Sequence, residues 1–161
     1  MSSDIETQDR KALLELQLKR LQSMLGPILQ NNAFYKQKLN DAGITRPEDI
    51  RTVADYQRLP FTSKTELSTD QIAHPPYGTN LTGSQDQFVR VHQTSGTTGQ
   101  PLRCMDTDES WTWFAQCWKR VYQGAGVIAA DRIFFAFSFG PFIGFWTALE
   151  GARLLGALSL S

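Results

Sequence analysis

Residues 91–104 of the chain are VHQTSGTTGQPLRC, and six consecutive positions within them are hydroxyl residues or glycine. These positions are Thr94, Ser95, Gly96, Thr97, Thr98 and Gly99. Glycine permits a positive φ and close approach to the backbone, successive N–H groups in such a turn bind anions, and hydroxyls add rotatable donors. The stretch is neither a Walker A loop nor a GxGxxG motif. By itself it is either a phosphate-binding loop or a flexible hairpin tip.

The segments on both sides of this loop are strand-like. They are QFVRVHQ (87–93) and LRCMDT (102–107), and we predict that they pair as a hairpin around the loop. His92 lies next to the loop. It either contacts a ligand there or is a strand histidine with a local hydrogen bond, and the second interpretation is favoured.

A helix is predicted directly after the hairpin, over 108–123. Asp106 and Glu109 are spaced as a capping pair for its start. Its aromatic face has helical spacing, which is more typical of core than of a ligand wall. That face consists of Trp111, Phe114, Ala115, Trp118 and Val121 or Tyr122.

The end of the chain has the pattern of a βαβ unit. RIFFAFSF (132–139) is a nearly continuous apolar run, typical of a strand buried on both faces. A helix over about 142–154 follows it, and GALSLS (156–161) begins another strand. Strand, helix and strand at this spacing predict a parallel sheet, so the fold class is α/β. Because the chain stops at this last strand, we expect it to be the N-terminal part of a longer protein.

The first part of the chain is predicted to be helical. An apolar stripe indicates a first helix, which Gly26-Pro27 would kink or end. The stripe either packs on its own domain, which is favoured, or serves as a docking helix. It consists of Leu14, Leu18, Leu21, Leu25 and Ile28.

Short helices are predicted after this first one. A helix around 31–43 would be closed by Gly43. Pro47 suits the first turn of another, Thr52 can cap VADYQRL, and Ser63 with Glu66 forms a capping box. We therefore expect a helical leader over 1–73, an exposed loop over 74–86, and a partial α/β subdomain over 87–161.

Composition excludes several classes of protein. The 161 residues carry 16 basic and 16 acidic side chains, so the positive field that nucleic-acid binding needs is absent. No apolar stretch is long enough to span a bilayer, and the polar N-terminus is not a signal peptide. The two cysteines lack any metal-ligand spacing. We expect a cytoplasmic protein with no metal site, no nucleic-acid partner and no membrane partner.

Three stretches of the chain resemble one known family. TSGTTGQP (94–101) resembles the phosphate-loop signature of the adenylate-forming (AMP-binding) superfamily, which includes acyl-CoA synthetases, adenylation domains and luciferases. FYKQKLNDAGITRPEDIRTVADYQRLPFTSKTEL (34–67) resembles the leader of the phenylacetate–CoA ligase branch, and FAFSFGPFIG (135–144) lies where that branch has an aromatic motif lining its acyl pocket. The likeness covers residues 34–161.

The resemblance implies a fold and an activity. The fold would be a helical leader followed by the first part of the large N-terminal domain of an adenylate-forming enzyme. The full-length enzyme would be an AMP-forming ligase that joins a carboxylic acid of the phenylacetate or aryl type to coenzyme A. It would use ATP and Mg²⁺. Thr94, Ser95, Gly96, Thr97, Thr98 and Gly99 would bind the ATP phosphates. Phe137, Phe139, Gly140 and Phe142 would wall the acyl pocket.

The resemblance also indicates what this segment lacks. It carries no catalytic side chain, no Tyr-Gly-x-Thr-Glu segment and no C-terminal domain with a mobile lysine, so alone it is expected to be inactive. Its partners would be the acid and the remainder of the ligase, and a homodimer is compatible with it. Two alternatives stay open: an adenylation enzyme that loads a carrier protein, and a non-catalytic remnant or interaction module.

The sequence departs from the family pattern beside the loop. Gln100 and Leu102 stand where relatives often have lysine, and Arg103 is the nearest cation. The phosphate contacts are therefore expected to come from hydroxyls and backbone N–H groups. Phe137 and Phe139 occupy places where the branch often has tyrosine, which favours an apolar acid.

Overall fold

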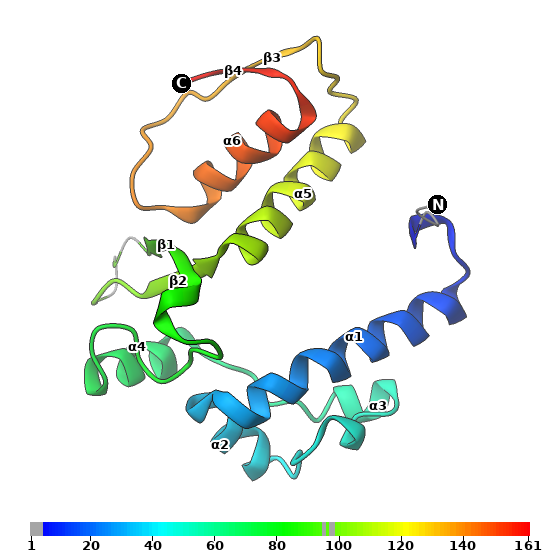
Figure 1. The fold of residues 1–161 in the computed structure, drawn as a ribbon, viewed down its shortest axis with the longest axis vertical. Helices are drawn as coiled ribbons and strands as arrows, with labels where there is room; N and C mark the ends of the chain where they lie inside the picture. The colour runs from blue at the N-terminus through cyan, green and yellow to red at the C-terminus, as the bar shows by residue number, and fades with distance from the viewer. Residues whose placement is uncertain (1–4, 95, 97–98) are drawn as a thin grey trace. The chain divides into compact units, whose positions relative to one another are not determined.

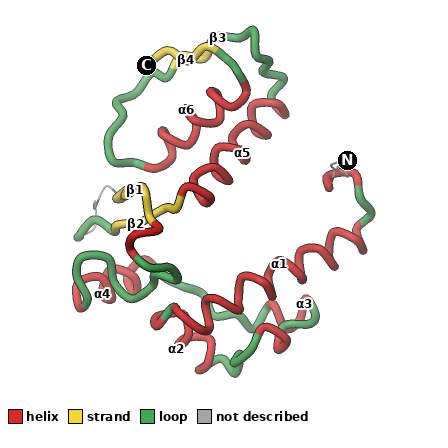
Figure 2. The backbone as a smooth tube through the Cα atoms, viewed as in Figure 1, coloured by secondary structure: helices red, strands yellow, loops and turns green. Residues whose placement is uncertain are grey.

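The computed structural model describes residues 5–94, 96 and 99–161 of the chain. They divide into two compact units, Met1–Gly83 and Ser84–Ser161. The elements of both are drawn in Figure 1. The described part of the first unit is helix and loop, and the second carries the four described strands (Figure 2).

The first unit opens with a short 3-10 turn, Ile5–Thr7, and the long helix α1, Arg10–Asn31. Gly26-Pro27 was predicted to kink or end the helix, and since α1 continues through Pro27, the second of these outcomes is wrong. Proline removes one N–H donor from the helix. Leu25 and Leu29, on either side of it, are both buried in the core of this unit, and their burial holds the helix together across the missing bond.

The apolar stripe of α1 packs on its own unit for most of its length, as favoured from the sequence. Only Leu14 at its start is exposed, to 39%. Gln22 Nε2 donates to the Ile50 carbonyl at 2.8 Å, which fixes α1 to a distant loop. The buried core consists of Leu25, Leu29, Leu39, Ile44 and Ile50, with Leu18, Leu21 and Ile28 packed against it.

Helix α2, Ala33–Asp41, ends in a Schellman motif. Gly43 has a φ of +73° and its N–H donates to the Asn40 carbonyl at 2.9 Å. The Ile44 N–H donates to the Leu39 carbonyl at 2.9 Å. Gly43 thus closes this helix as predicted, from the position just after the C-cap.

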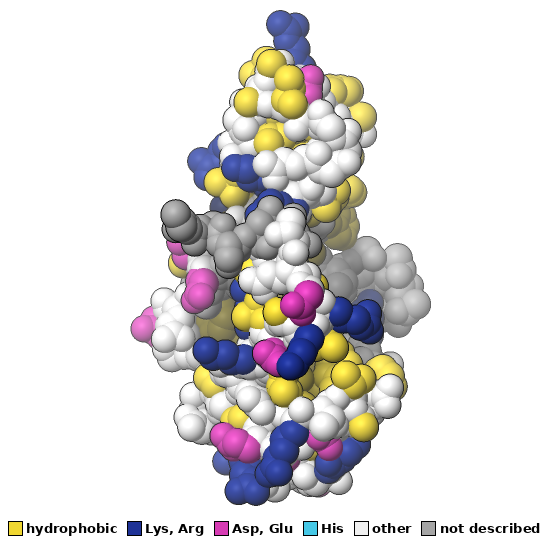
Figure 3. Space-filling view, turned by 90° about the vertical axis from the view of Figure 1, so that its right-hand side faces the viewer, with side chains coloured by type: hydrophobic (Ala, Val, Ile, Leu, Met, Phe, Trp, Pro, Cys, Tyr) yellow, Lys and Arg dark blue, Asp and Glu magenta, His cyan; other side chains and the backbone are white. Residues whose placement is uncertain are grey.

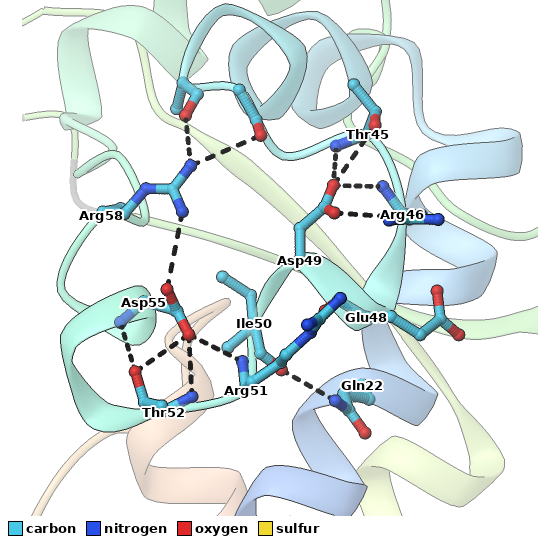
Figure 4. A network of polar contacts seen from close by, with 12 residues as sticks. Gln22, Thr45, Arg46, Glu48, Asp49, Ile50, Arg51, Thr52, Asp55 and Arg58 are labelled. Carbon is cyan, nitrogen blue, oxygen red and sulfur yellow. Dashed lines mark hydrogen bonds and ion pairs between the residues drawn. The ribbon is translucent and has the colours of Figure 1, made fainter.

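A polar network holds the turn that follows α2 (Figure 4). The 3-10 turn Pro47–Asp49 begins with proline, as predicted. The Asp49 carboxylate accepts from the Thr45 N–H at 2.9 Å and the Arg46 N–H at 3.1 Å. The Thr45 N–H, followed by the Arg46 side chain, lowers the pKa of Asp49 to about 2. The ionised carboxylate therefore holds the backbone of Thr45 and Arg46 in this turn.

The next turn repeats this arrangement. Helix α3, Val53–Tyr56, has a capping box between Thr52 and Asp55, which confirms Thr52 as its cap. Hydrogen bonds from the Arg51 N–H and from Thr52 lower the pKa of Asp55. Arg58 lies 3.6 Å from the same carboxylate (Figure 4).

Helix α4, Lys64–Ala73, begins with the predicted capping box of Ser63 and Glu66. Glu66 also pairs with Lys38 of α2. The Lys38 ammonium, and then the Ser63 N–H, lower the pKa of Glu66 to about 2. The cap of α4 therefore also joins this helix to α2.

We predict that Gly78→Ala destabilises the loop after α4. Asp70 accepts from the Thr79 N–H and hydroxyl at 2.6 and 2.7 Å. Gly78 has a φ of +78°, and a Cβ there would lie 2.3 Å from Asp70 Oδ2. The strained φ and the displaced carboxylate together should cost about 2 kcal/mol, measured by urea unfolding with circular dichroism.

Gly126→Ala is the matched control for this substitution. Its φ is +79°, but a Cβ there meets no atom within 4 Å, so it should lose only about 1 kcal/mol. Equal losses in the two variants would show that the Asp70 contact contributes nothing.

The second unit starts with the 3-10 turn Gln85–Gln87 and an antiparallel hairpin. The hairpin pairs β1, Phe88–Gln93, with β2, Arg103–Thr107, as predicted. Helix α5, Asp108–Gly124, follows at once.

The cap of α5 differs from the prediction. Thr107, not Asp106, accepts the Ser110 N–H, at 3.1 Å. Asp106 is buried instead and accepts the Ser110 hydroxyl at 2.9 Å. Because Asp106 is buried, the adjacent threonine takes the capping position.

The predicted βαβ unit is present. β3, Arg132–Phe134, and β4, Leu158–Leu160, are parallel, and α6, Ile143–Leu155, connects them. The strand predicted over 132–139 is much shorter, and it is not buried on both faces. Phe135 is buried in the helix-facing core, whereas Phe134 is 71% exposed, because successive side chains point to opposite sides.

Helices α5 and α6 lie side by side (Figure 1). Trp111 and Ala115 of α5 are buried, and Trp118 and Tyr122 pack against the α6 core, so most of the predicted face is core. Phe114 is exposed. Gly151 of α6 lies where the two helices approach each other closely.

The described surface mixes charged and apolar side chains. On the face drawn in Figure 3, Lys and Arg lie among Asp and Glu. Phe61 of the first unit is 97% exposed. Among the described helices, none has the length and apolar character needed to cross a bilayer.

Candidate functional site

The base of the glycine–hydroxyl loop is closed by Thr94 and Leu102. The Thr94 N–H donates to the Leu102 carbonyl at 2.9 Å, and the Leu102 N–H donates to Thr94 Oγ1 at 3.0 Å. Leu102 is buried. These two bonds continue the hairpin for one more pair and fix where the loop leaves the strands.

The two glycines of the loop have backbone conformations that suit glycine. Gly96 has a φ of +67°, and a Cβ there would lie 2.9 Å from the Gly99 carbonyl oxygen and 3.0 Å from Pro101 Cγ. The Gly99 N–H donates to the Gly96 carbonyl at 3.0 Å. The loop is thus a tight turn whose backbone only glycine leaves open to a ligand.

Three predicted phosphate-binding residues, Ser95, Thr97 and Thr98, lie outside the described residues. Around them, Gln100 and Arg103 are exposed while Leu102 is buried. Of the two positions at which relatives often carry lysine, one is therefore an exposed glutamine and the other a core leucine.

The predicted acyl-pocket residues belong to an aromatic cluster in the segment between β3 and α6. Phe137 and Phe145 stack with ring centroids 3.8 Å apart. Phe139 lies 5.3 Å from Phe137 and 4.9 Å from Trp146. Phe137 is 36% exposed, so the cluster presents an aromatic surface rather than closing on itself.

The other predicted pocket residues form the turn into α6. Trp146 Nε1 donates to the Gly140 carbonyl at 2.7 Å. A Cβ at Gly140 would lie 3.4 Å from the Phe142 ring. The hydrogen bond from Trp146 to Gly140 could not be foreseen from the sequence, because the spacing of an indole does not specify its acceptor.

The loop and the aromatic segment meet in the structure. The Gln93 N–H, at the base of the loop, donates to the Pro141 carbonyl at 3.1 Å. This backbone bond places the base of the loop beside the aromatic segment. Neither Gln93 nor Pro141 was singled out from the sequence, since a backbone contact leaves no signal in residue type.

A buried polar cluster lies under the same strand. His92 stacks on Trp111, with centroids 4.9 Å apart and rings 10° from parallel. Its Nδ1 is 3.8 Å from Asp106 Oδ2. Burial lowers the pKa of His92; Asp106 opposes that shift and Arg90 adds to it. His92 is therefore expected to be neutral at pH 7.

The described residues fit a phosphate but supply no metal site. The open backbone at Gly96 and the hydroxyl of Thr94 suit phosphate oxygens. In the ranges that the structure describes, no group of three or more His, Cys, Asp or Glu side chains could hold a metal ion.

Comparison with known proteins finds relatives of one kind. No family model matches the sequence. The chain is 32% identical to a phenylacetate-coenzyme A ligase of Thermus thermophilus over 153 residues, which are 95% of this chain and 33% of that protein. It is 33% identical to a phenylacetate-coenzyme A ligase of Escherichia coli over 153 residues, which are 95% of this chain and 34% of that protein.

Solved structures give the same result. A 2-hydroxyisobutyryl-CoA ligase in complex with 2-HIB-AMP and CoA, in the thioesterification state, matches with a TM-score of 0.89 and 31% identity. The match covers 96% of this chain and 32% of that one. An open conformation of the ligase matches with a TM-score of 0.83 and 30% identity, over 91% of this chain and 34% of that one.

The fold of the chain is thus that of the first part of an adenylate-forming CoA ligase. In sequence and in fold the chain is similar, over nearly its whole length, to the N-terminal part of these CoA ligases. It spans about a third of the length of the curated relatives that it matches.

Proposed function

We propose that this chain supplies the ATP-phosphate loop and one wall of the acid pocket of an AMP-forming carboxylic acid–CoA ligase. The observation that carries the proposal is the hydrogen bond from Gln93 to Pro141. It brings the glycine–hydroxyl loop next to the aromatic segment, which suits a reaction that joins a phosphate ester to an organic acid.

The proposed reaction has two steps. A carboxylate oxygen attacks the α-phosphorus of ATP and pyrophosphate leaves, which gives an acyl-adenylate. The sulfur of coenzyme A then attacks the acyl carbonyl, and AMP leaves. Neither step requires a side-chain nucleophile, so the barrier is lowered by positioning and by stabilising charge on the phosphates.

The loop would bind the β- and γ-phosphates. Thr94 Oγ1 already accepts from the Leu102 N–H, which leaves its proton for donation to a phosphate oxygen. The turn at Gly96 would let the oxygens approach backbone N–H groups. The proposed phosphate-binding residues are Thr94, Ser95, Gly96, Thr97, Thr98 and Gly99.

The acid pocket would be apolar. Phe137, Phe139 and Phe142 present rings without hydroxyl groups, and Phe142 packs beside Gly140. Flat rings of this kind favour an aromatic or arylacetic acid by stacking and burial. The rest of the pocket and of the adenine site would come from the remainder of the ligase.

The proposal includes ATP and coenzyme A as co-substrates. Mg²⁺ would serve the phosphates, with ligands from outside the described residues. The helical part, 1–73, and the loop, 74–86, would precede the nucleotide-binding part, 87–161, and a homodimer would be compatible with this arrangement.

The test uses ATP–pyrophosphate exchange in the protein expressed from its complete natural reading frame, with phenylacetic acid as the first substrate. Thr97→Ala with Thr98→Ala removes two hydroxyl donors. The rate of exchange should fall roughly 30-fold, which corresponds to about 1 kcal/mol for each hydrogen bond.

The matched control is Thr65→Ala with Thr69→Ala. Both threonines are exposed on α4, and exchange should stay within about twofold of the wild type. Unchanged exchange in the loop variant would count against a phosphate role for these two hydroxyls. No exchange in the wild type with any aryl acid would overturn the proposed activity.

A further inference from the structure

His92 is one of the few buried polar residues of the second unit that the structure describes. Its side chain is 7% exposed and stacks on Trp111, which is itself buried. Arg90, two residues earlier on the same strand, places its guanidinium 4.3 Å from the Trp111 ring. The Trp111 ring therefore contacts both Arg90 and His92, which lie on the same face of β1.

Asp106 faces His92 from β2 of the hairpin. Its Oδ1 accepts the Ser110 hydroxyl at 2.9 Å, and its Oδ2 lies 3.8 Å from His92 Nδ1. Within the described ranges, neither His92 Nδ1 nor Asp106 Oδ2 has a hydrogen-bond partner. A movement of about 1 Å would turn this contact into a hydrogen bond from imidazole to carboxylate.

The other charged side chains near this pair form an ion pair with each other. Arg90 lies 3.5 Å from Glu150 of α6. Arg90 therefore has a carboxylate partner of its own and leaves Asp106 to His92.

The backbone next to His92 forms the base of the loop. Gln93 follows it directly and donates to Pro141, and Thr94 then pairs with Leu102. A fixed side chain at position 92 therefore holds the backbone of Gln93 and Thr94, whose N–H groups donate these two hydrogen bonds. Buried polar groups without partners are costly, and two apolar side chains could fill the same space at lower cost.

We infer that His92 and Asp106 are positioning residues for the phosphate loop, because they hold the end of β1 and with it the Thr94–Leu102 pair from which the loop begins. The inference rests on the proposed function. The pair closes to a hydrogen bond when the loop is occupied, as contacts that are long in a free enzyme often do.

The experiment compares His92→Phe and Asp106→Asn with the wild type in the protein from its complete reading frame. Phe keeps the stacking on Trp111, and Asn keeps the shape of Asp106. Amide hydrogen exchange is measured without nucleotide over residues 93–102 and over α5 and α6. Both variants should exchange roughly tenfold faster at 93–102 with α5 and α6 unchanged.

Kinetics provide the second readout. The KM for Mg·ATP should rise roughly tenfold in both variants, while kcat and the KM for the acid stay within about threefold. Val91→Thr is the control, because Val91 lies beside His92 on β1 and is exposed. This control should match the wild type in both measurements.

Unchanged exchange at 93–102 in both variants would overturn the inference. Faster exchange throughout α5 and α6 in both would also overturn it, because the pair would then serve only the general packing. If the wild type neither binds nor turns over Mg·ATP, the proposed function fails, whereas the exchange at 93–102 still decides whether the pair positions the loop.

Discussion

Gly151→Ala is expected to destabilise the second unit by about 3 kcal/mol. A Cβ at this position would lie 2.4 Å from Trp118 Cβ and 3.1 Å from both the Ala115 carbonyl oxygen and the Lys119 nitrogen. Two of these three atoms are backbone, so the neighbouring helix cannot make room by turning a side chain. α5 and α6 would have to separate, which opens the core between them.

The expected sign is opposite to that of helix propensity. Replacing glycine by alanine inside a helix ordinarily stabilises by up to about 1 kcal/mol. Urea unfolding followed by tryptophan fluorescence measures the effect in this unit, because all four tryptophans belong to it. They are Trp111, Trp113, Trp118 and Trp146.

Gly144→Ala is the matched control on the same helix. A Cβ there meets no atom within 4 Å, so this variant should be as stable as the wild type or up to about 1 kcal/mol more stable. If Gly151→Ala unfolded at the same urea concentration as the wild type, α5 and α6 would not be in the close contact at Gly151 that the structure shows.

Gly96→Ala is expected to lower ATP–pyrophosphate exchange about 100-fold, the loss typical of removing one donor that stabilises charge on a reacting group. The φ of +67° disfavours alanine, and the new Cβ would lie 2.9 Å from the Gly99 carbonyl oxygen. Relief of that contact must turn the loop backbone, and its N–H groups would no longer face the phosphates. The strained φ should also cost about 1 kcal/mol of stability, as at Gly126, so exchange is measured at a temperature at which both variants remain folded.

Gly126→Ala again provides the control. It has a similar φ, +79°, in open space away from the loop, so its exchange rate should equal that of the wild type. If Gly96→Ala retained full exchange, the loop geometry would be irrelevant to catalysis, even where the hydroxyl groups matter.

Local signals in the sequence predicted much of the fold. Thr52, Ser63 and Gly43 act at helix ends as expected, because a cap depends on hydrogen bonds between residues only three to five positions apart. The hairpin and the βαβ unit were predicted for a similar reason, since alternation and turn residues specify the connection between neighbouring elements.

The predictions that failed each required knowledge of burial. Pro27 stays inside α1 because Leu25 and Leu29 are both held in the core. Asp106 left the cap to Thr107 because its carboxylate is enclosed beside His92. The apolar run 132–139 predicted that Phe134 is buried. It is exposed because its side chain points away from the side of the sheet that the helices cover.

Residue type and spacing were enough to predict the glycine–hydroxyl loop, the aromatic segment, the order of the elements and the resemblance to a ligase family. The hydrogen bond from Gln93, at the base of the loop, to Pro141 of the aromatic segment and the approach of His92 to Asp106 are visible only in the folded chain. Contacts between distant parts of a chain depend on how α5 and α6 pack against the strands, and pairwise packing leaves no pattern in one sequence.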